Sequence, residues 1–374
     1  MASYWLDEPA PPLPTRPLDG PPDVEIVGGG VTGCSCALTL AAAGVRVRLH
    51  EARTIAAGAS GRNGGFALRG GSMAYHEAIA TLGRERAAEL WRLTEDGLRS
   101  LAALAGDAFR ATGSLRLAAD DAELRSLRAE YDALLADGFA VEWIEPLPPQ
   151  LAHFSGGFRH TPDGAIQPAR WVRRLAARAA ESGADLREGS LVESLGRLEA
   201  PVVLLATDGY TQGLLPELDA VVTPIRNQVI VTEPIEESLF PLPHYARHGF
   251  DYWQQLPDGR LVVGGRRHAD MAAEASAEER LTPVIQERLE AFAAELVGGV
   301  PVITHRWAGI FGSSPDGLPL AGPVPRNDGL WVAAGYAGHG NVLGLVCGDL
   351  VARGILGERP AALELFEPAR IVGR

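Results

Sequence analysis

The stretch from Val24 to Glu51 constrains the fold more than any other part of this chain. The apolar run Val24–Val27 predicts a strand, Cys34–Ala43 predicts a helix, and Val45–His50 predicts a second strand that ends at an acidic residue. Glycines with the spacing G-x-G-x-x-G join the first strand to the helix. A βαβ unit with these glycines and this acid is typical of dinucleotide binding.

Each part of this motif has a physical role in holding a dinucleotide. Gly28 permits a tight turn, Gly30 lets the backbone approach a pyrophosphate, and Gly33 lets the helix pack close to the strand. Free N–H groups at the start of the helix bind phosphate. Glu51 accepts hydrogen bonds from an adenosine ribose and repels a 2′-phosphate. The binding residues expected here are Gly28, Gly30, Val31, Thr32, Gly33, Glu51, Ala52 and Arg53.

Two later segments are also rich in glycine. Residues Gly58–Phe66 interleave serine, arginine and asparagine with small residues, which favours a phosphate-binding loop over the alternative, a flexible linker. Leu330–Ala334 predicts a strand, Gly335–Gly340 a glycine turn and Asn341–Leu356 a helix. A second unit of this kind suits a long cofactor whose far end meets a second helix N-terminus.

The first glycine motif, the segment Ala59–Gly65 and the turn Gly335–Gly340 resemble the FAD-binding segments of the D-amino acid oxidase, glycine oxidase and sarcosine oxidase superfamily. The segment Ala59–Gly65 is most similar to the γ-glutamylputrescine oxidoreductase-like branch, and the resemblance covers nearly the whole chain. It implies that Leu204–Tyr210 contains a strand returning under the cofactor. The further FAD-binding residues that it implies are Ser60, Gly61, Arg62, Asn63, Gly64, Gly65, Val192, Thr207, Gly335, Gly338, His339, Gly340, Asn341 and Val342.

The resemblance implies an α/β fold (α+β overall), in which a mixed β-sheet substrate domain is inserted into a discontinuous, Rossmann-like FAD-binding domain. We expect a proline-rich arm at 1–22, the FAD-binding domain at 23–82, 150–212 and 305–374, and the substrate domain at 83–149 and 213–304. Residues 252–265 predict a hairpin, and 83–104, 121–137, 169–182 and 277–296 predict helices. The β-meander that family members carry after Val192 is expected to shrink to a short turn before Val202.

The composition indicates two domains in a reducing compartment. A chain of 374 residues exceeds the usual size of a single core. Its N-terminus lacks the features of a signal peptide, and no apolar run is long enough to cross a bilayer. Because Cys34, Cys36 and Cys347 are too few for a disulfide framework, we expect a cytoplasmic protein in which the first two are small buried residues. The net charge of −13 disfavours nucleic acid and anionic membrane as partners.

All 34 basic residues other than histidine are arginine, so the chain contains no lysine. This excludes pyridoxal-phosphate Schiff bases, lysine-imine aldolases and P-loop phosphoryl transfer, because each requires an ε-amine. It also removes the lysine with which sarcosine oxidases activate oxygen near flavin N5, whose position matches Val262. The electron acceptor is therefore either O₂ or another molecule.

The chemistry implied by the resemblance is FAD-dependent oxidation of an amine C–N bond in a small molecule. Hydride passes to flavin N5, and the imine product hydrolyses to a carbonyl compound. The backbone of Gly338–Gly340 is expected to stabilise negative charge on the flavin, and we favour such a backbone role for His339 over a role as base. FAD is expected to bind non-covalently, because residues 307–314 hold no cysteine and residues 59–66 no histidine for attachment.

Phe311 stands where amino-acid oxidases of the family carry a carboxylate-binding arginine. With Tyr252 and Trp253 it is expected to form a cage for an apolar or cationic amine, the alternative being ordinary core packing. The catalytic residues expected are therefore Tyr252, Phe311 and His339. The candidates for a relocated carboxylate clamp are Arg69, Arg226 and Arg266, each of which is more often a surface or packing residue.

Three functions stay open at this point. The first is an amine oxidase or dehydrogenase, the second a D-amino acid or glycine/sarcosine-type enzyme with a relocated clamp, and the third a flavin-binding protein without turnover. No metal is expected, because the pair His244 and His248 lies between Pro243 and Gly249, a segment too short for a stable helix.

Overall fold

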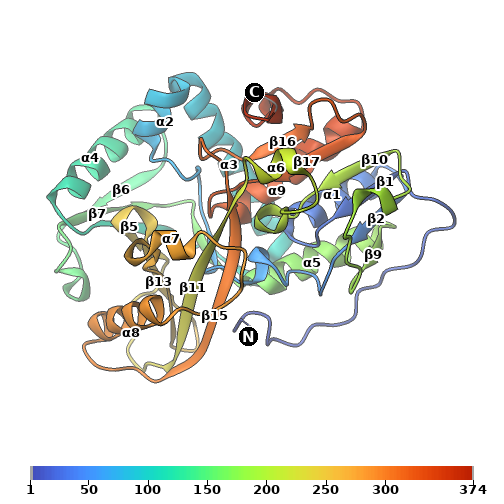
Figure 1. The fold of residues 1–374 in the computed structure, drawn as a ribbon. Helices are drawn as coiled ribbons and strands as arrows, with labels where there is room; N and C mark the ends of the chain where they lie inside the picture. The colour runs from blue at the N-terminus through green and yellow to red at the C-terminus, as the bar shows by residue number, and fades with distance from the viewer. Residues whose placement is uncertain (1–2, 373–374) are drawn as a thin grey trace.

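The computed structural model describes residues 3–372, which contain two large sheets side by side (Figure 1). In the first sheet the strand order is β16-β17-β10-β1-β2-β9, and every pair is parallel except β16 with β17. Its strands are β1 (Val24–Val27), β2 (Val47–His50), β9 (Asp185–Arg187), β10 (Val202–Leu205), β16 (Leu320–Pro323) and β17 (Leu330–Ala334). The parallel strands end at one edge, where ligands bind in folds of this type.

Three helices pack together beside this sheet: α1 (Val31–Ala42), α5 (Pro168–Glu181) and α9 (Gly340–Ile355). α1 lies against both α5 and α9, and the approach to α9 depends on glycine. A Cβ at Gly344 would lie 2.6 Å from Val31 Cγ1, and a Cβ at Gly348 would lie 2.5 Å from the carbonyl oxygen of Thr32. α3 (Arg84–Ala105) packs on α9 and α5 from outside.

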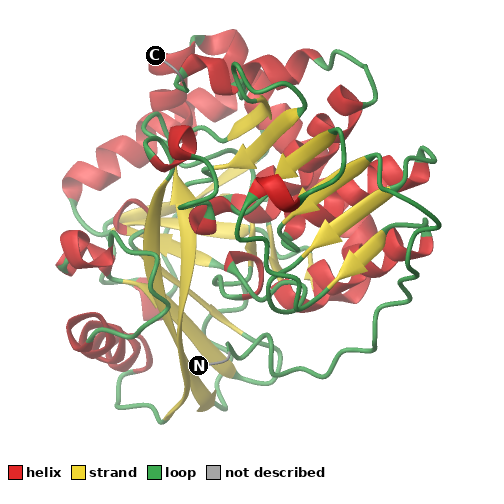
Figure 2. Ribbon diagram, turned by 45° about the vertical axis from the view of Figure 1, so that its right-hand side comes forward, coloured by secondary structure: helices red, strands yellow, loops and turns green. Residues whose placement is uncertain are grey.

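The second sheet is mostly antiparallel, with the order β15-β11-β14-β13-β12-β5-β7-β6. Its strands are β5 (Ser114–Ala118), β6 (Val141–Ile144), β7 (Gly156–His160), β11 (Thr223–Pro234), β12 (His244–Ala246), β13 (Asp251–Gln255), β14 (Arg260–Gly265) and β15 (Ile303–Ser313). α4 (Asp121–Ala136) packs on β5 and β7, and α8 (Pro283–Val297) packs on β11 and β14. Figure 2 shows the long strands of this sheet extending away from the first sheet.

Shorter elements complete the fold. They are the helices α2 (Tyr75–Leu82), α6 (Pro216–Asp219) and α7 (Met271–Glu274), and a small sheet of β3 (Phe66–Ala67), β8 (Gly164–Ile166) and β4 (Phe109–Arg110). The three cysteines are buried and free, and burial raises the pKa of each thiol, which confirms the prediction that Cys34 and Cys36 are buried residues.

Most elements expected from the sequence are present, including the 252–265 hairpin and the shortened connection before β10, where the chain forms only a 3₁₀ turn at Leu195–Arg197. The first helix starts at Val31 rather than Cys34, because the glycine turn is shorter than expected. α8 starts at Pro283 rather than residue 277, since proline favours the first helical turn. The domain division stays a prediction; β7 and β15 belong to the second sheet, although most of their residues fall in ranges assigned to the FAD-binding domain.

The N-terminal segment is attached to the rest of the molecule at its beginning. Ser3 Oγ donates to the carbonyl oxygen of Gly61 at 2.5 Å, and Trp5 Nε1 donates to that of Asn63 at 2.7 Å. The Trp5 side chain is 2% exposed. Through these two hydrogen bonds and the buried Trp5 ring, the segment holds the glycine-rich loop after β2 in place.

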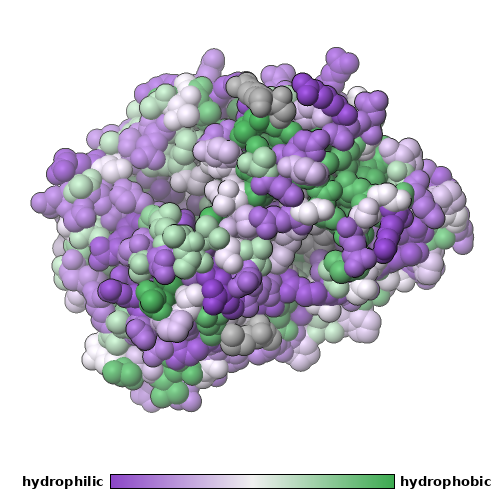
Figure 3. All heavy atoms as spheres, viewed as in Figure 1, coloured by the Kyte–Doolittle hydropathy of each residue, from purple (hydrophilic) through white to green (hydrophobic). Residues whose placement is uncertain are grey.

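Hydrophilic residues cover most of the face seen in Figure 3, and the more apolar part lies toward the upper right, where β10, β16 and β17 run in Figure 1. Within residues 3–372, no helix has the length and apolar character needed to cross a membrane.

Replacing Trp5 with alanine should lower the free energy of unfolding by about 3–5 kcal/mol, because it leaves a cavity and an unpaired carbonyl under the loop. Denaturant unfolding of the purified variant measures this. Pro12→Ala, in the exposed part of the same arm, is the matched control and should unfold with the parent protein. Equal unfolding midpoints for Trp5→Ala and the parent would contradict the supporting role.

Candidate functional site

A cavity of about 760 Å³ lies where the ends of the parallel strands meet the second sheet. The predicted site residues that line it are Gly28, Gly30, Val31, Thr32, Glu51, Ala52, Arg53, Ser60, Arg62, Asn63, Gly64, Val192, Thr207, Tyr252, Phe311, Gly338, His339, Gly340, Asn341 and Val342. Segments from both ends of the chain thus converge on one space.

The turn between β1 and α1 presents its backbone to this cavity. Gly28 has a φ of 114°, and a Cβ there would lie 2.5 Å from the carbonyl oxygen of Ala206. A Cβ at Gly30 would approach Ser60 Oγ to 2.9 Å, and the same hydroxyl accepts a hydrogen bond from the Val31 N–H at 3.0 Å. The first N–H of α1 is thus bonded to Ser60, while the glycine turn and Thr32 face the cavity.

Glu51 is fixed at the end of β2 by two backbone N–H groups. Its Oε2 accepts from Gly29 at 2.8 Å, and its Oε1 accepts from Arg53 at 2.8 Å. Each carboxylate oxygen has a second lone pair, so the group can still accept hydrogen bonds from a ligand hydroxyl.

Two arginines of the cavity share one carboxylate. Glu279, on the segment between α7 and α8, accepts from Arg53 Nη1 at 2.9 Å and lies 3.3 Å from Arg62 Nη2. The Tyr210 hydroxyl also donates to Glu279. Burial raises the pKa of the Glu279 carboxyl, but hydrogen bonds from Arg53 and Tyr210 prevail and hold that pKa below its usual value.

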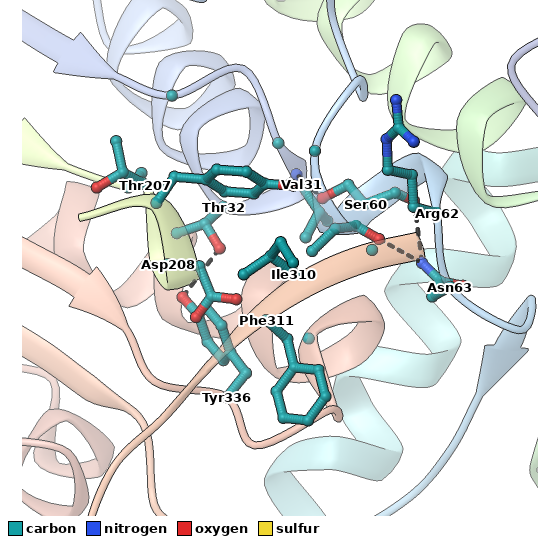
Figure 4. Close-up of a pocket in the computed structure, with 18 of the residues that line it drawn as sticks. Val31, Thr32, Ser60, Arg62, Asn63, Thr207, Asp208, Ile310, Phe311 and Tyr336 are labelled. Atoms are coloured by element: carbon teal, nitrogen blue, oxygen red, sulfur yellow. Dashed lines mark hydrogen bonds between the residues drawn. The ribbon is translucent and has the colours of Figure 1, made fainter. Parts of the chain in front are cut away.

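The turn before α9 is tied to α1 and to β10. Thr32 Oγ1 donates to the Tyr336 hydroxyl at 2.9 Å (Figure 4). Asp208 accepts from the N–H groups of Gly335 at 2.8 Å and Gly312 at 2.9 Å. Burial raises the pKa of the Asp208 carboxyl, although these N–H groups act in the opposite direction.

His339 lies at the N-cap of α9 and lines the cavity. Burial lowers the pKa of its imidazole to about 4, and the positive charge of Arg116 acts in the same direction. The ring is therefore neutral above about pH 5, with only one of its two nitrogens protonated.

Four glycines predicted to bind the cofactor lie behind the cavity wall instead. Gly33, Gly61 and Gly65 would each place a Cβ within 2.6 Å of a backbone carbonyl oxygen, so close packing explains them. Gly335 has a φ of 83° and donates its N–H to Asp208. These residues shape the wall without lining it.

Aromatic side chains line the cavity near the second sheet. The Phe66 and Tyr252 rings lie 5.7 Å apart, edge to face, and Tyr245 lies 6.4 Å from Tyr252. Figure 4 shows the Phe311 ring at a distance from Thr207 and Ser60, at the opposite end of the labelled residues. The prediction that Trp253 belongs to this cage is wrong, because adjacent strand residues point to opposite faces and Trp253 stacks on His244 in the core.

The predictions for a relocated carboxylate clamp are also wrong. Arg69 pairs with Glu95 at 2.5 Å, Arg226 with Glu274 at 3.0 Å and Arg266 with Asp251 at 3.1 Å. None of the three arginines lines the cavity within the described chain. Each neutralises an acidic group of the protein and is unavailable to a ligand there.

Several lining residues were not predicted from the sequence. Asp208 and Tyr336 lie inside motifs that were recognised, so their positions next to predicted residues were a usable signal. Asn227 and Glu279 come from β11 and from the segment before α8. No local pattern marks either residue, because only the tertiary fold brings them to the cavity.

Comparison with known proteins places this arrangement in context. A family model described as "FAD dependent oxidoreductase" matches residues 23–353. A probable oxidoreductase OrdL of Rhizobium meliloti is 30% identical, covering 96% of this chain and 89% of that protein. The γ-glutamylputrescine oxidoreductase of Escherichia coli is 29% identical over 90% of this chain and 84% of its own length. The crystal structure of glycine oxidase from Geobacillus kaustophilus superimposes with a TM-score of 0.74 at 23% identity, covering 94% and 98% of the two chains.

Two glycines of the first motif should respond differently to alanine. Gly30→Ala should fold normally, because the Ser60 hydroxyl can rotate away, but should weaken dinucleotide binding by about 10- to 100-fold. Gly33→Ala places a Cβ 2.0 Å from the Gly28 carbonyl oxygen and should lower the free energy of unfolding by about 1–3 kcal/mol. Cofactor titration and thermal unfolding separate the effects. Undiminished binding in a folded Gly30→Ala variant would show that no pyrophosphate lies there.

Proposed function

Because this chain belongs to the family of FAD-dependent oxidoreductases whose model matches residues 23–353, we propose that it oxidises the C–N bond of a small amine. The observation that carries the proposal is the form of the cavity. One side presents the N-termini of α1 and α9, and the other side presents aromatic rings from the second sheet. The first side suits an anionic dinucleotide, and the second suits an amine that is largely apolar.

FAD is proposed to bind non-covalently between these two sides and, when bound, supplies a group that accepts hydride from the carbon next to an amine nitrogen. Glu51 would hold the ribose, the N-terminus of α1 the pyrophosphate, and the turn at 338–340 the pyrimidine edge of the flavin. The residues proposed to line the FAD site are Gly28, Gly30, Val31, Thr32, Glu51, Ala52, Arg53, Ser60, Arg62, Asn63, Gly64, Val192, Thr207, Gly338, His339, Gly340, Asn341 and Val342.

The aromatic side chains at the end of the cavity next to the second sheet position the substrate and exclude water. They are Phe66, Tyr245, Tyr252 and Phe311. Burial raises the pKa of Tyr252 above its ordinary value, so its hydroxyl keeps its proton. The neutral His339 ring is a poor acceptor for a proton at this pKa. We therefore infer that the amine enters as the neutral base and that the protein contributes orientation and charge stabilisation.

The position of Phe311 favours an amine over a simple α-amino acid. A carboxylate held against this ring would lose water without gaining an ion-pair partner, at a cost of several kcal/mol. The second candidate, oxidation of glycine or D-amino acids, is supported by the structural similarity to glycine oxidase, but Arg69, Arg226 and Arg266 are unable to serve it.

An anaerobic panel of candidate substrates tests this proposal. The purified protein should be yellow, release its FAD on acid denaturation, and bleach faster with alkylamines and diamines than with glycine, sarcosine or D-alanine. Efficient bleaching by the three amino acids would favour the second candidate. Absence of bleaching with every compound would indicate a flavin-binding protein without turnover. Admitting air afterwards shows whether O₂ serves as the acceptor.

The pH dependence of flavin reduction should follow the substrate. Because His339 is neutral above about pH 5, the rate should rise with pH toward the pKa of the amine, as the neutral amine becomes more abundant. His339→Asn should shift the rate but keep the same profile, measured by stopped-flow absorbance. An ionisation between pH 6 and 8 that disappears in this variant would identify His339 as a base.

A further inference from the structure

The carbonyl oxygens of residues 61–65, in the glycine-rich loop after β2, all accept hydrogen bonds from side chains outside that loop. The donors are Ser3 Oγ to Gly61 at 2.5 Å, Trp307 Nε1 to Arg62 at 2.8 Å, Trp5 Nε1 to Asn63 at 2.7 Å, and Gln254 Nε2 to Gly64 at 2.6 Å and to Gly65 at 3.0 Å. They come from the N-terminal segment and from β13 and β15 of the second sheet. Side chains far from the loop in sequence thus fix the direction of five successive peptide groups.

Two of these peptide groups direct their N–H toward the cavity. Each is planar and trans, so its N–H points away from its C=O. The Arg62 carbonyl is bonded to Trp307 and the Asn63 carbonyl to Trp5, which leaves the N–H groups of Asn63 and Gly64 on the opposite side. Both residues line the cavity, in which Figure 4 shows Asn63. In the part of the chain that the structure describes, neither N–H has a protein acceptor, so both are available to a ligand.

The two tryptophans fix the orientation of these peptides more strictly than Gln254 does. The indole N–H is a donor only. If either peptide flipped, its N–H would meet the indole N–H, and both buried donors would lose their acceptor. The Gln254 amide carries an acceptor as well as donors, so it can bond to a peptide in either orientation. Trp5 is 2% exposed and Trp307 is 0% exposed, so bulk water does not replace the lost partner.

We propose that Trp5 and Trp307 are positioning residues for the cofactor. Their indole N–H groups hold the N–H groups of Asn63 and Gly64 toward the FAD ring, where these donors stabilise negative charge. A hydride brings two electrons and one proton, so its transfer adds one negative charge to the ring. Neither tryptophan lines the cavity, and each acts through the peptide whose carbonyl it binds.

This inference rests on the proposed function and extends it to the N-terminal segment of the chain. A carbonyl that accepts a hydrogen bond polarises its own peptide group, which makes the N–H of that peptide a stronger donor. Donors that are already oriented need no reorganisation when the charge appears, and such donors are effective in catalysis for this reason.

Phenylalanine at either position removes the donor and keeps an aromatic ring. In FAD-loaded protein, Trp5→Phe and Trp307→Phe should each make the flavin reduction potential more negative, measured against redox dyes without any amine. At saturating amine the rate of flavin reduction should fall about 10-fold, while the amine concentration that gives half of the maximal rate stays unchanged. Trp171→Phe is the matched control and should keep the parent potential. Trp171 is 0% exposed, and its Nε1 has no hydrogen-bond partner within residues 3–372.

The reduction potential separates positioning from a purely structural role. If the two variants unfold more easily but keep the parent potential, the indoles only hold the loop, and the inference is overturned. A shift of equal size in Trp171→Phe would also overturn it. Either variant alone is sufficient for the test if the other does not fold. If the potentials shift as expected but no amine bleaches the flavin, the proposed amine oxidation fails and the role of the two indoles stands.

Discussion

The close approach of α1 and α9 is the contact on which the rest of the site depends. Glycines at 344 and 348 let the side chains of Val31 and Ser35 on α1 pack directly on the backbone of α9, and the Thr32–Tyr336 hydrogen bond joins the start of α1 to the turn before α9. The N-termini of two helices that are about three hundred residues apart in sequence are thereby held at one cavity. A larger residue at either glycine would separate the two halves of the cavity wall rather than merely loosen the core.

Asp208 extends this arrangement to the second sheet. Its carboxylate receives N–H groups from the end of β15 and from the turn after β17, so one side chain fixes three segments. Phe311 immediately precedes one of these donors, Gly312. The position of Phe311 relative to the N-termini of α1 and α9 is therefore set by backbone hydrogen bonds to Asp208, which lines the cavity.

The sequence predicted the parts of the site that local motifs encode. The strand, glycine turn and helix of the first unit determine their own geometry, and Glu51 lies where its spacing from Gly33 places it. The assignment of Trp253 to the cage failed because the hairpin was recognised without deciding which of its faces the cavity would share.

The arginines were harder to predict than the glycines. Whether a guanidinium is free depends on which carboxylate the fold brings to it, and Arg226 and Glu274 are far apart in sequence. Arg266 and Arg267 are neighbours in the sequence, yet Arg266 pairs with Asp251, whereas Arg267 lies over Phe250 and has no carboxylate partner among residues 3–372. The tertiary structure brings Asp251 to only one of them, which the sequence does not reveal.

Glu279 has a consequence for how the cavity wall keeps its shape. The guanidinium groups of Arg53 and Arg62 would repel each other if they stood alone, but this one carboxylate, on the segment between α7 and α8, pairs with both. The two arginines are therefore held by the protein itself, so this part of the wall needs no bound anion to stay in place.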